Sequence, residues 1–150
     1  MRGFTLIEIL IVVAGITILA SIVLFPLASF RRTAQLSSAI EEGVSLLVSA
    51  RLKTLSSEGA TQYGVHFETV KMVFFVGTTY ITGNPQNSEV LIPNDVEIST
   101  ISLNGGAVDV VFKRLTGETD QHGTVLFRLK SDPSNTKTLR IEQTGAVHGA

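Results

Sequence analysis

A single carboxylate, Glu8, stands at the start of an uncharged stretch that runs from Ile9 to Phe30. At about 1.5 Å per residue, a helix over that stretch would measure roughly 33 Å, enough to cross the hydrocarbon of a bilayer. A carboxylate in such a helix costs about 2.5 to 3.5 kcal/mol at mid-bilayer and less near the interface. Glu8 is therefore either an acid of the first helical turn, favoured by the helix dipole and reaching toward the headgroups, or a group with a partner to pair with.

The other residues capable of chemistry are scattered along the chain. His66, His122 and His148 fall on different predicted elements and lack the His-x-x-x-His or carboxylate spacing of a metal site. His66 alternates to the polar face of its predicted strand, which indicates a solvated surface histidine. Asp120 and Asp132 lie in predicted loops and could contribute to a calcium site, but calcium takes about six to eight oxygen ligands. With neither a nucleophile beside a base nor a glycine loop for phosphate, the sequence predicts a protein that is not an enzyme and holds no metal or cofactor.

Three kinds of N-terminal segment contain an apolar run. A secretory signal peptide has an apolar region of only about 7 to 15 residues and a small-x-small cleavage site, whereas this run is longer and carries Glu8. A plain single-pass anchor fits the length but has no need of Gly3, Phe4 or Glu8. The third kind matches the order Gly3-Phe4-Thr5-Leu6-Ile7-Glu8 before a long apolar helix, which resembles the processing site of type IV prepilins and type II secretion pseudopilins.

The resemblance implies roles for four residues. Gly3 and Phe4 would be the processing site, with cleavage between them by a prepilin peptidase and N-methylation of Phe4. Glu8 would pair with the N-terminal amine of a neighbouring subunit, which offsets the cost of an intramembrane carboxylate. Pro26 removes one helical hydrogen bond, and members of the family often carry a proline near this position, where the helix loosens as subunits pack. Glu8 and Pro26 are thus the expected assembly residues.

The implied function is that of a structural subunit, a minor pilin or a pseudopilin, assembled into a filament of a type IV pilus or a type II secretion system. The implied partners are other pilin or pseudopilin subunits, the prepilin peptidase, an inner-membrane assembly platform and the lipid bilayer. Before assembly the chain would be a single-pass cytoplasmic (inner) membrane protein with an extracytoplasmic C-terminal domain. Charge alone leaves this topology undecided, because Arg2 flanks one end of the apolar run while Arg31 and Arg32 flank the other.

Length and composition limit the size and character of the rest of the chain. The chain has 150 residues, a net charge of -1 and no cysteine. It has room for the anchor and one globular domain. It has no disulfide, although many pilins close their C-terminal region with one. From Thr33 onward nine Lys and Arg stand against twelve Asp and Glu, a mildly acidic balance that argues against a strongly basic nucleic-acid binder.

Residues 31–59 are predicted to continue the helix in amphipathic form. Apolar side chains recur every three or four residues and predict its buried face: Leu36, Ile40, Val44, Val48, Leu52 and Leu55. Gly43 is less favourable in a helix than Ala by about 1 kcal/mol, and it marks either a bend or a close contact. Gly59 suits a left-handed cap at the end of the helix.

Beyond Gly59 the apolar period changes to two, which predicts strands separated by turns. The predicted strands are Tyr63–Phe67, Val70–Val76, Ser88–Ile92, Val96–Leu103, Val108–Lys113, Thr124–Lys130 and Thr138–Gln143. We expect an α+β, pilin-like fold, in which one long N-terminal helix covers the apolar face of an antiparallel sheet. The expected division is a leader at residues 1–3, a transmembrane and filament-core helix at 4–30, its amphipathic continuation at 31–59 and a β domain at 60–150.

One helix followed only by strands is an order that also resembles the H-type pseudopilins and the FimT-like minor pilins. The residues that carry this resemblance are Ala50-Arg51, Tyr63-Gly64-Val65-His66-Phe67, Val110-Val111-Phe112 with Gly117, Leu139-Arg140-Ile141 and Thr144-Gly145. Because some FimT-like pilins bind DNA, the alternative function is a DNA-binding minor pilin for DNA uptake.

The candidate DNA contacts are four cations that could share the polar face of neighbouring strands: Lys113, Arg128, Lys130 and Arg140. The competing interpretation is a solvated face in which Asp109 and Glu142 interrupt the cations. The C-terminal tract Gly145-Ala146-Val147-His148-Gly149 also lacks the arginines that DNA-binding members place around that glycine. A nucleic-acid partner is therefore the less favoured alternative.

Overall fold

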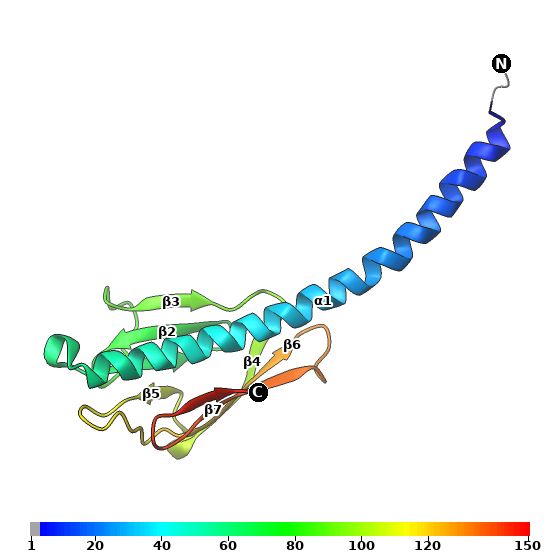
Figure 1. Ribbon diagram of the computed structural model, residues 1–150. Helices are drawn as coiled ribbons and strands as arrows, with labels where there is room; N and C mark the ends of the chain where they lie inside the picture. The colour runs from blue at the N-terminus through cyan, green and yellow to red at the C-terminus, as the bar shows by residue number, and fades with distance from the viewer. Residues whose placement is uncertain (1–3) are drawn as a thin grey trace.

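A long N-terminal helix dominates the shape of the molecule. The computed structural model describes residues 4–150, apart from the side chains of residues 22–28. Helix α1 (Leu6–Leu55) is continuous, and its first half projects as a gently curved rod from a β domain that packs along its second half (Figure 1). The predicted α+β class is confirmed. The expected leader at residues 1–3, with Gly3, lies outside the described residues, as does the side chain of Pro26.

Within residues 4–150 the β domain consists of two antiparallel sheets of four strands each, and the prediction of one sheet was wrong. The strand order is β3-β2-β1-β5 in the first sheet and β4-β6-β7-β8 in the second. The strands are β1 (Tyr63–Phe67), β2 (Lys71–Val76), β3 (Ser88–Leu91), β4 (Val96–Leu103), β5 (Asp109–Val111), β6 (Gly123–Leu129), β7 (Thr136–Ile141) and β8 (Val147–Gly149). Two short 3₁₀ turns, η1 (Glu58–Ala60) and η2 (Asn104–Gly106), lie between these elements.

Both sheets and the helix share one hydrophobic core. Phe67 of β1, Phe112 after β5 and Phe127 of β6 are fully buried, together with Leu36 and Leu47 of the helix. Burying each such side chain stabilises the fold by about 1.5 to 3 kcal/mol. The second half of α1 is therefore a central element of the domain, whereas the described side chains of its first half, at residues 6–21, 29 and 30, are exposed.

The buried face of α1 agrees with the predicted stripe only in its first turns. Leu36 and Ile40 are buried, but Val48 is 41% exposed and Leu52 is 59% exposed. Side chains four residues apart are rotated by about 400° around the helix axis. Each step of the predicted stripe therefore turns about 40° away from a face that runs straight along the helix. The residues that continue the buried face are Gly43, Leu47, Ala50 and Thr54.

Gly43 lies where the helix approaches both sheets. A Cβ atom at this position would lie 3.3 Å from Met72 Sδ in β2 and 3.4 Å from Leu139 Cδ2 in β7. Of the two explanations for this glycine, the close contact is the one that the structure supports.

The C-terminal end of the helix differs from the prediction. The helix ends at Leu55 with Ser56 as its C-cap, so it stops short of the predicted boundary at residue 59. Ser57 takes the left-handed conformation with φ of 55°, and Gly59 follows in η1 with φ of 61°. The left-handed residue that terminates the helix is therefore a serine.

Local sequence chemistry located most of the strands. β1 and β4 have their predicted bounds, and the other predicted strands begin or end within two residues of the prediction. Strand β8 was missed. It is three residues long and pairs with the edge of β7, with Leu139 opposite Gly149.

Candidate functional site

The first turn of α1 contains the predicted assembly residue Glu8. Thr5 is the N-cap: its Oγ1 accepts a hydrogen bond from the Glu8 N–H (3.3 Å), and Glu8 Oε2 accepts one from the Thr5 N–H (3.5 Å). This reciprocal capping box satisfies two amide groups at a helix start, where the dipole also favours a negative charge. Glu8 is therefore the first-turn acid of one interpretation. Its carboxylate is also exposed, which leaves it open to a second partner.

Apolar side chains surround the projecting half of α1. Those that are more than half exposed include Phe4, Leu6, Ile7, Ile9, Leu10, Ile11, Val12, Val13, Ile16, Ile18 and Leu19. Leu10 to Val13 are consecutive, so their side chains point in every direction around the helix axis. A helix that is apolar all round requires apolar surroundings on every side.

Among the residues whose side chains are described, no helical segment is both long enough and apolar enough to cross a membrane.

The four cations considered for DNA binding do not form one strip. Arg128 lies on β6 and Arg140 on the neighbouring β7, but Arg140 stands opposite Thr124. Four residues along β6 separate Thr124 from Arg128, which is roughly 13 Å at the usual strand rise. Lys130 follows β6, and Lys113 follows β5 in the other sheet.

Acidic side chains pair with three of these four cations. Arg128 Nε lies 2.7 Å from Glu97 Oε1, and Arg140 Nε lies 2.6 Å from Glu142 Oε1. Lys113 Nζ lies 2.6 Å from Asp120, whose hydrogen bond raises the pKa of that lysine. This geometry agrees with the competing interpretation of cations interrupted by acids, although Asp109 contacts a histidine instead.

His66 is not a solvated surface histidine, and that expectation was wrong. Its Nδ1 contacts Asp109 Oδ1, its Nε2 lies 3.5 Å from Glu68 Oε1, and its side chain is only 14% exposed. The imidazole also stacks on Tyr80, with 3.9 Å between ring centroids. The two carboxylates approach opposite ring nitrogens, so they cannot share one metal ion with the histidine.

The two aspartates considered for calcium have other contacts. Asp120 pairs with Lys113, and Asp132 accepts hydrogen bonds from the backbone and side chain of Ser134 in its own turn. Across the described part of the chain, no group of three His, Cys, Asp or Glu side chains could hold a metal ion.

Residues from three of the segments that carry the family resemblance meet at the far end of α1, namely Arg51, Gly117 and Thr144-Gly145. Arg51 donates from Nε to the Gly117 carbonyl (3.1 Å) and from Nη2 to the Thr144 carbonyl (3.1 Å). Gly145 takes φ of +79°, and a Cβ atom there would lie only 1.9 Å from the Gly117 carbonyl oxygen. Arg51 therefore joins the helix to two loops, one after β5 and one after β7. Sequence reasoning noted these residues singly but did not predict that they meet.

The comparisons with known proteins agree with this architecture. No known protein family and no curated protein matches the sequence. Among solved structures, two crystal forms of the type IV minor pilin FimU of Pseudomonas aeruginosa are similar to this chain. One has a TM-score of 0.56 at 14% identity and covers 77% of this chain and 92% of FimU; the other has a TM-score of 0.59 at 14% identity and covers 79% and 90%.

The similarity to FimU shows that the chain has the type IV pilin fold. The likeness covers 77% to 79% of this chain and 90% to 92% of FimU. The predicted resemblance to the type IV pilin superfamily is confirmed at the level of the fold.

Proposed function

We propose that this chain is a pilin-like structural subunit, a minor pilin or a pseudopilin, of a type IV pilus or a type II secretion system. Residues 4–30 hold it in the cytoplasmic membrane with the β domain outside, and the same residues form the filament core after assembly. The observation that carries the proposal is the apolar surface all round the projecting helix, joined to a pilin-fold domain. Such a helix is suited to lipid and equally to a bundle of its own kind.

The work of this subunit is mechanical and not enzymatic. Its partners are other pilin or pseudopilin subunits, the prepilin peptidase that cleaves between Gly3 and Phe4, the inner-membrane assembly platform and the lipid bilayer. Because FimU is a type IV minor pilin, we favour a minor subunit of a pilus over a subunit of the secretion system. Counting the copies of this chain in purified filaments tests whether it is a minor or a major subunit.

Processing provides the direct test of the proposal. The full chain is expressed with and without a prepilin peptidase, and its N-terminus is identified by mass spectrometry. With the peptidase we expect Phe4 at the N-terminus, carrying a methyl group, and without it we expect Met1. Persistence of Met1 in the presence of an active peptidase would overturn the proposal.

DNA uptake remains the alternative function, with less support from the geometry. Acids already pair with Lys113, Arg128 and Arg140, so few phosphates can be neutralised without breaking an ion pair. Each neutralised phosphate contributes about -0.9 to the slope of log affinity against log salt. We expect the full chain in detergent to bind duplex DNA only at low salt.

One experimental result would favour DNA uptake over the structural role. Submicromolar affinity at about 0.15 M salt, lost when the four cations are replaced together by Ala, would make DNA uptake the leading function. The substitutions for that variant are Lys113→Ala, Arg128→Ala, Lys130→Ala and Arg140→Ala.

A further inference from the structure

A polar pocket of about 220 Å³ opens at the base of the β domain. At this level α1 leaves the domain to become the projecting rod (Figure 1). It is lined by Arg31, Arg32 and Gln35 of α1 and by Asp95, which precedes β4. One water molecule needs only about 10 to 15 Å³ of such space. The pocket therefore has room for a polar group of several non-hydrogen atoms.

The pocket contains donors and acceptors that lack partners within the part of the chain that is described. Neither guanidinium group, of Arg31 or Arg32, has an ion pair or a hydrogen bond there. The buried Oε1 of Gln35 also has no hydrogen-bond partner. Surrounding protein atoms enclose that oxygen, so the donors that the pocket presents are the exposed guanidinium groups.

Asp95 gives the pocket a negative side. Its carbonyl accepts a hydrogen bond from the Lys130 N–H (2.9 Å), which anchors the turn that carries the carboxylate to the end of β6. The pocket thus presents two guanidinium groups and one carboxylate. This combination matches a zwitterion better than a simple anion.

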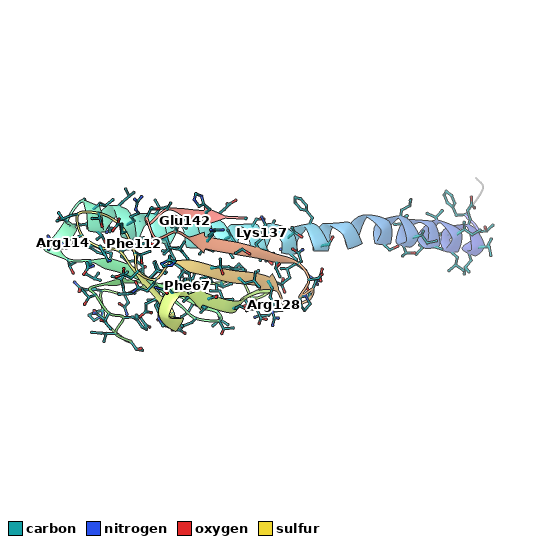
Figure 2. All side chains as sticks on the ribbon, turned by 90° about the horizontal axis from the view of Figure 1, so that it is seen from below. Phe67, Phe112, Arg114, Arg128, Lys137 and Glu142 are labelled. Atoms are coloured by element: carbon teal, nitrogen blue, oxygen red, sulfur yellow. The ribbon has the colours of Figure 1, made fainter. Side chains whose placement is uncertain are left out.

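The position of the pocket indicates where such a zwitterion is found. Arg31 directly follows the uncharged run that ends at Phe30. If residues 4–30 cross the bilayer, as the proposed function requires, the pocket lies at the level of the headgroups on the side of the β domain. Figure 2 shows Arg128 and Lys137 at this same end of the domain, and Arg114 at the opposite end.

We infer that this pocket binds the phosphoethanolamine headgroup of a membrane lipid. The guanidinium groups of Arg31 and Arg32 bind the phosphate, for which their planar pairs of donors are suited. The Asp95 carboxylate accepts hydrogen bonds from the ammonium group. A choline headgroup has no N–H to donate, and a glycerol headgroup has no positive charge opposite Asp95, so both should bind less well.

The inference rests on the proposed membrane location, and two separate measurements distinguish the failure of one from the failure of the other. The first is incorporation of the full chain into nanodiscs of phosphatidylcholine alone, which reads membrane insertion without the headgroup. Failure to incorporate would overturn the proposed location. The second is binding of water-soluble glycerophosphoethanolamine to the full chain in detergent, followed through ¹⁵N-labelled arginine side chains, which reads the pocket without the membrane.

Lipid selectivity is measured by native mass spectrometry of the full chain in detergent, with equal amounts of phosphatidylethanolamine and phosphatidylcholine of the same acyl chains. We expect the wild type to retain the ethanolamine lipid by about five- to tenfold over the choline lipid, the factor that roughly one charge-assisted hydrogen bond supplies. Asp95→Asn should remove the preference while lipid is still retained. Arg31→Gln with Arg32→Gln should remove retention of both lipids.

A matched control is available at the far end of the domain. Arg114→Gln removes a cation distant from the pocket and should leave retention and preference unchanged (Figure 2). Equal retention of the two lipids by the wild type would overturn the inference, as would full retention by the double glutamine variant. Inorganic phosphate that binds as tightly as glycerophosphoethanolamine would also overturn it, since the ammonium would then contribute nothing.

Discussion

Replacing Glu8 by Gln separates its local role from its role in assembly. Gln at this position can still accept a hydrogen bond from the Thr5 N–H, as Glu8 does over 3.5 Å, so the capping box can persist. The Thr5 hydroxyl and the Glu8 N–H are not altered at all. The substitution therefore removes the charge and little else from the start of the helix.

The expected loss follows from the proposed pairing of Glu8 with the N-terminal amine of a neighbouring subunit. Two unit charges about 4 Å apart interact by about 4 kcal/mol at an effective dielectric constant of 20. Removing one member of a buried pair costs about 3 to 5 kcal/mol, because the other charge is left without compensation. At about 1.4 kcal/mol per factor of ten, the affinity of a subunit for the filament should fall by roughly 10² to 4 × 10³. Membrane insertion should be unchanged or easier, since the carboxylate itself is costly in lipid.

The assay compares Glu8→Gln, Glu8→Ala and the wild type, each expressed with a prepilin peptidase and the assembly components. Cell fractionation reports membrane insertion, and the amount of the chain in sheared filaments reports incorporation. Both variants should insert and both should be depleted from filaments. Glu8→Ala should in addition weaken the helix start by about 1 kcal/mol, because it breaks half of the capping box.

Two results would separate the explanations. Normal filament incorporation of Glu8→Gln would refute the pairing of its charge with a neighbouring subunit. If Glu8→Ala alone were depleted, the residue would act only as a helix cap.

Further predictions concern the β domain, and each is checked by chemical denaturation of the full chain in detergent. Arg51→Ala should lower the free energy of unfolding by about 2 to 4 kcal/mol, since it removes two charge-assisted hydrogen bonds. The control Arg114→Ala removes only one exposed hydrogen bond, and an equal loss of stability in both variants would refute the special position of Arg51. Gly145→Ala should cost more stability than the roughly 1 to 3 kcal/mol expected for a left-handed backbone alone, because its Cβ would lie 1.9 Å from a carbonyl oxygen. The control Gly105→Ala has a similar φ but open space around it. Similar losses of stability in the two variants would argue against the clash. The hydrogen bond to Glu89 raises the pKa of Lys71 above its usual 10.5. The stability that this pair contributes should therefore be complete below pH 10.5 and should be lost as the pH rises through the raised pKa. Lys71→Gln should abolish this pH dependence.

Strands and turns could be predicted because their signals are local. In β1 the alternation that buries Val65 and Phe67 is visible in five consecutive residues. β4 likewise has its predicted bounds, although a bulge between Ile98 and Thr100 interrupts its register with β6. Such irregularities depend on the partner strand, which period-two patterns do not identify.

Contacts between segments that lie far apart in the chain could not be predicted from the sequence. The division into two sheets depends on which strands pair, and β1 finds β5, more than forty residues later, as its second neighbour. The partners of His66 are likewise divided between its own strand end and β5. The alternation that placed His66 on a polar face was correct, but a polar face can be covered by a stacked tyrosine and two carboxylates.

The drift of the helical stripe has a consequence for how the domain closes. Because the buried face passes through Leu47, Ala50 and Thr54, Arg51 lies at its border, one step from fully buried Ala50. From this border its side chain reaches the carbonyls of two loops, and Thr54 Oγ1 accepts a hydrogen bond from the Tyr63 N–H of the first strand (3.0 Å). A chain without cysteine has no covalent means of closing its C-terminal region. In this protein Arg51, in the last two turns of α1, instead joins the loop after β7 to the helix by a hydrogen bond, so the far end of the helix helps to hold the C-terminal strands in place.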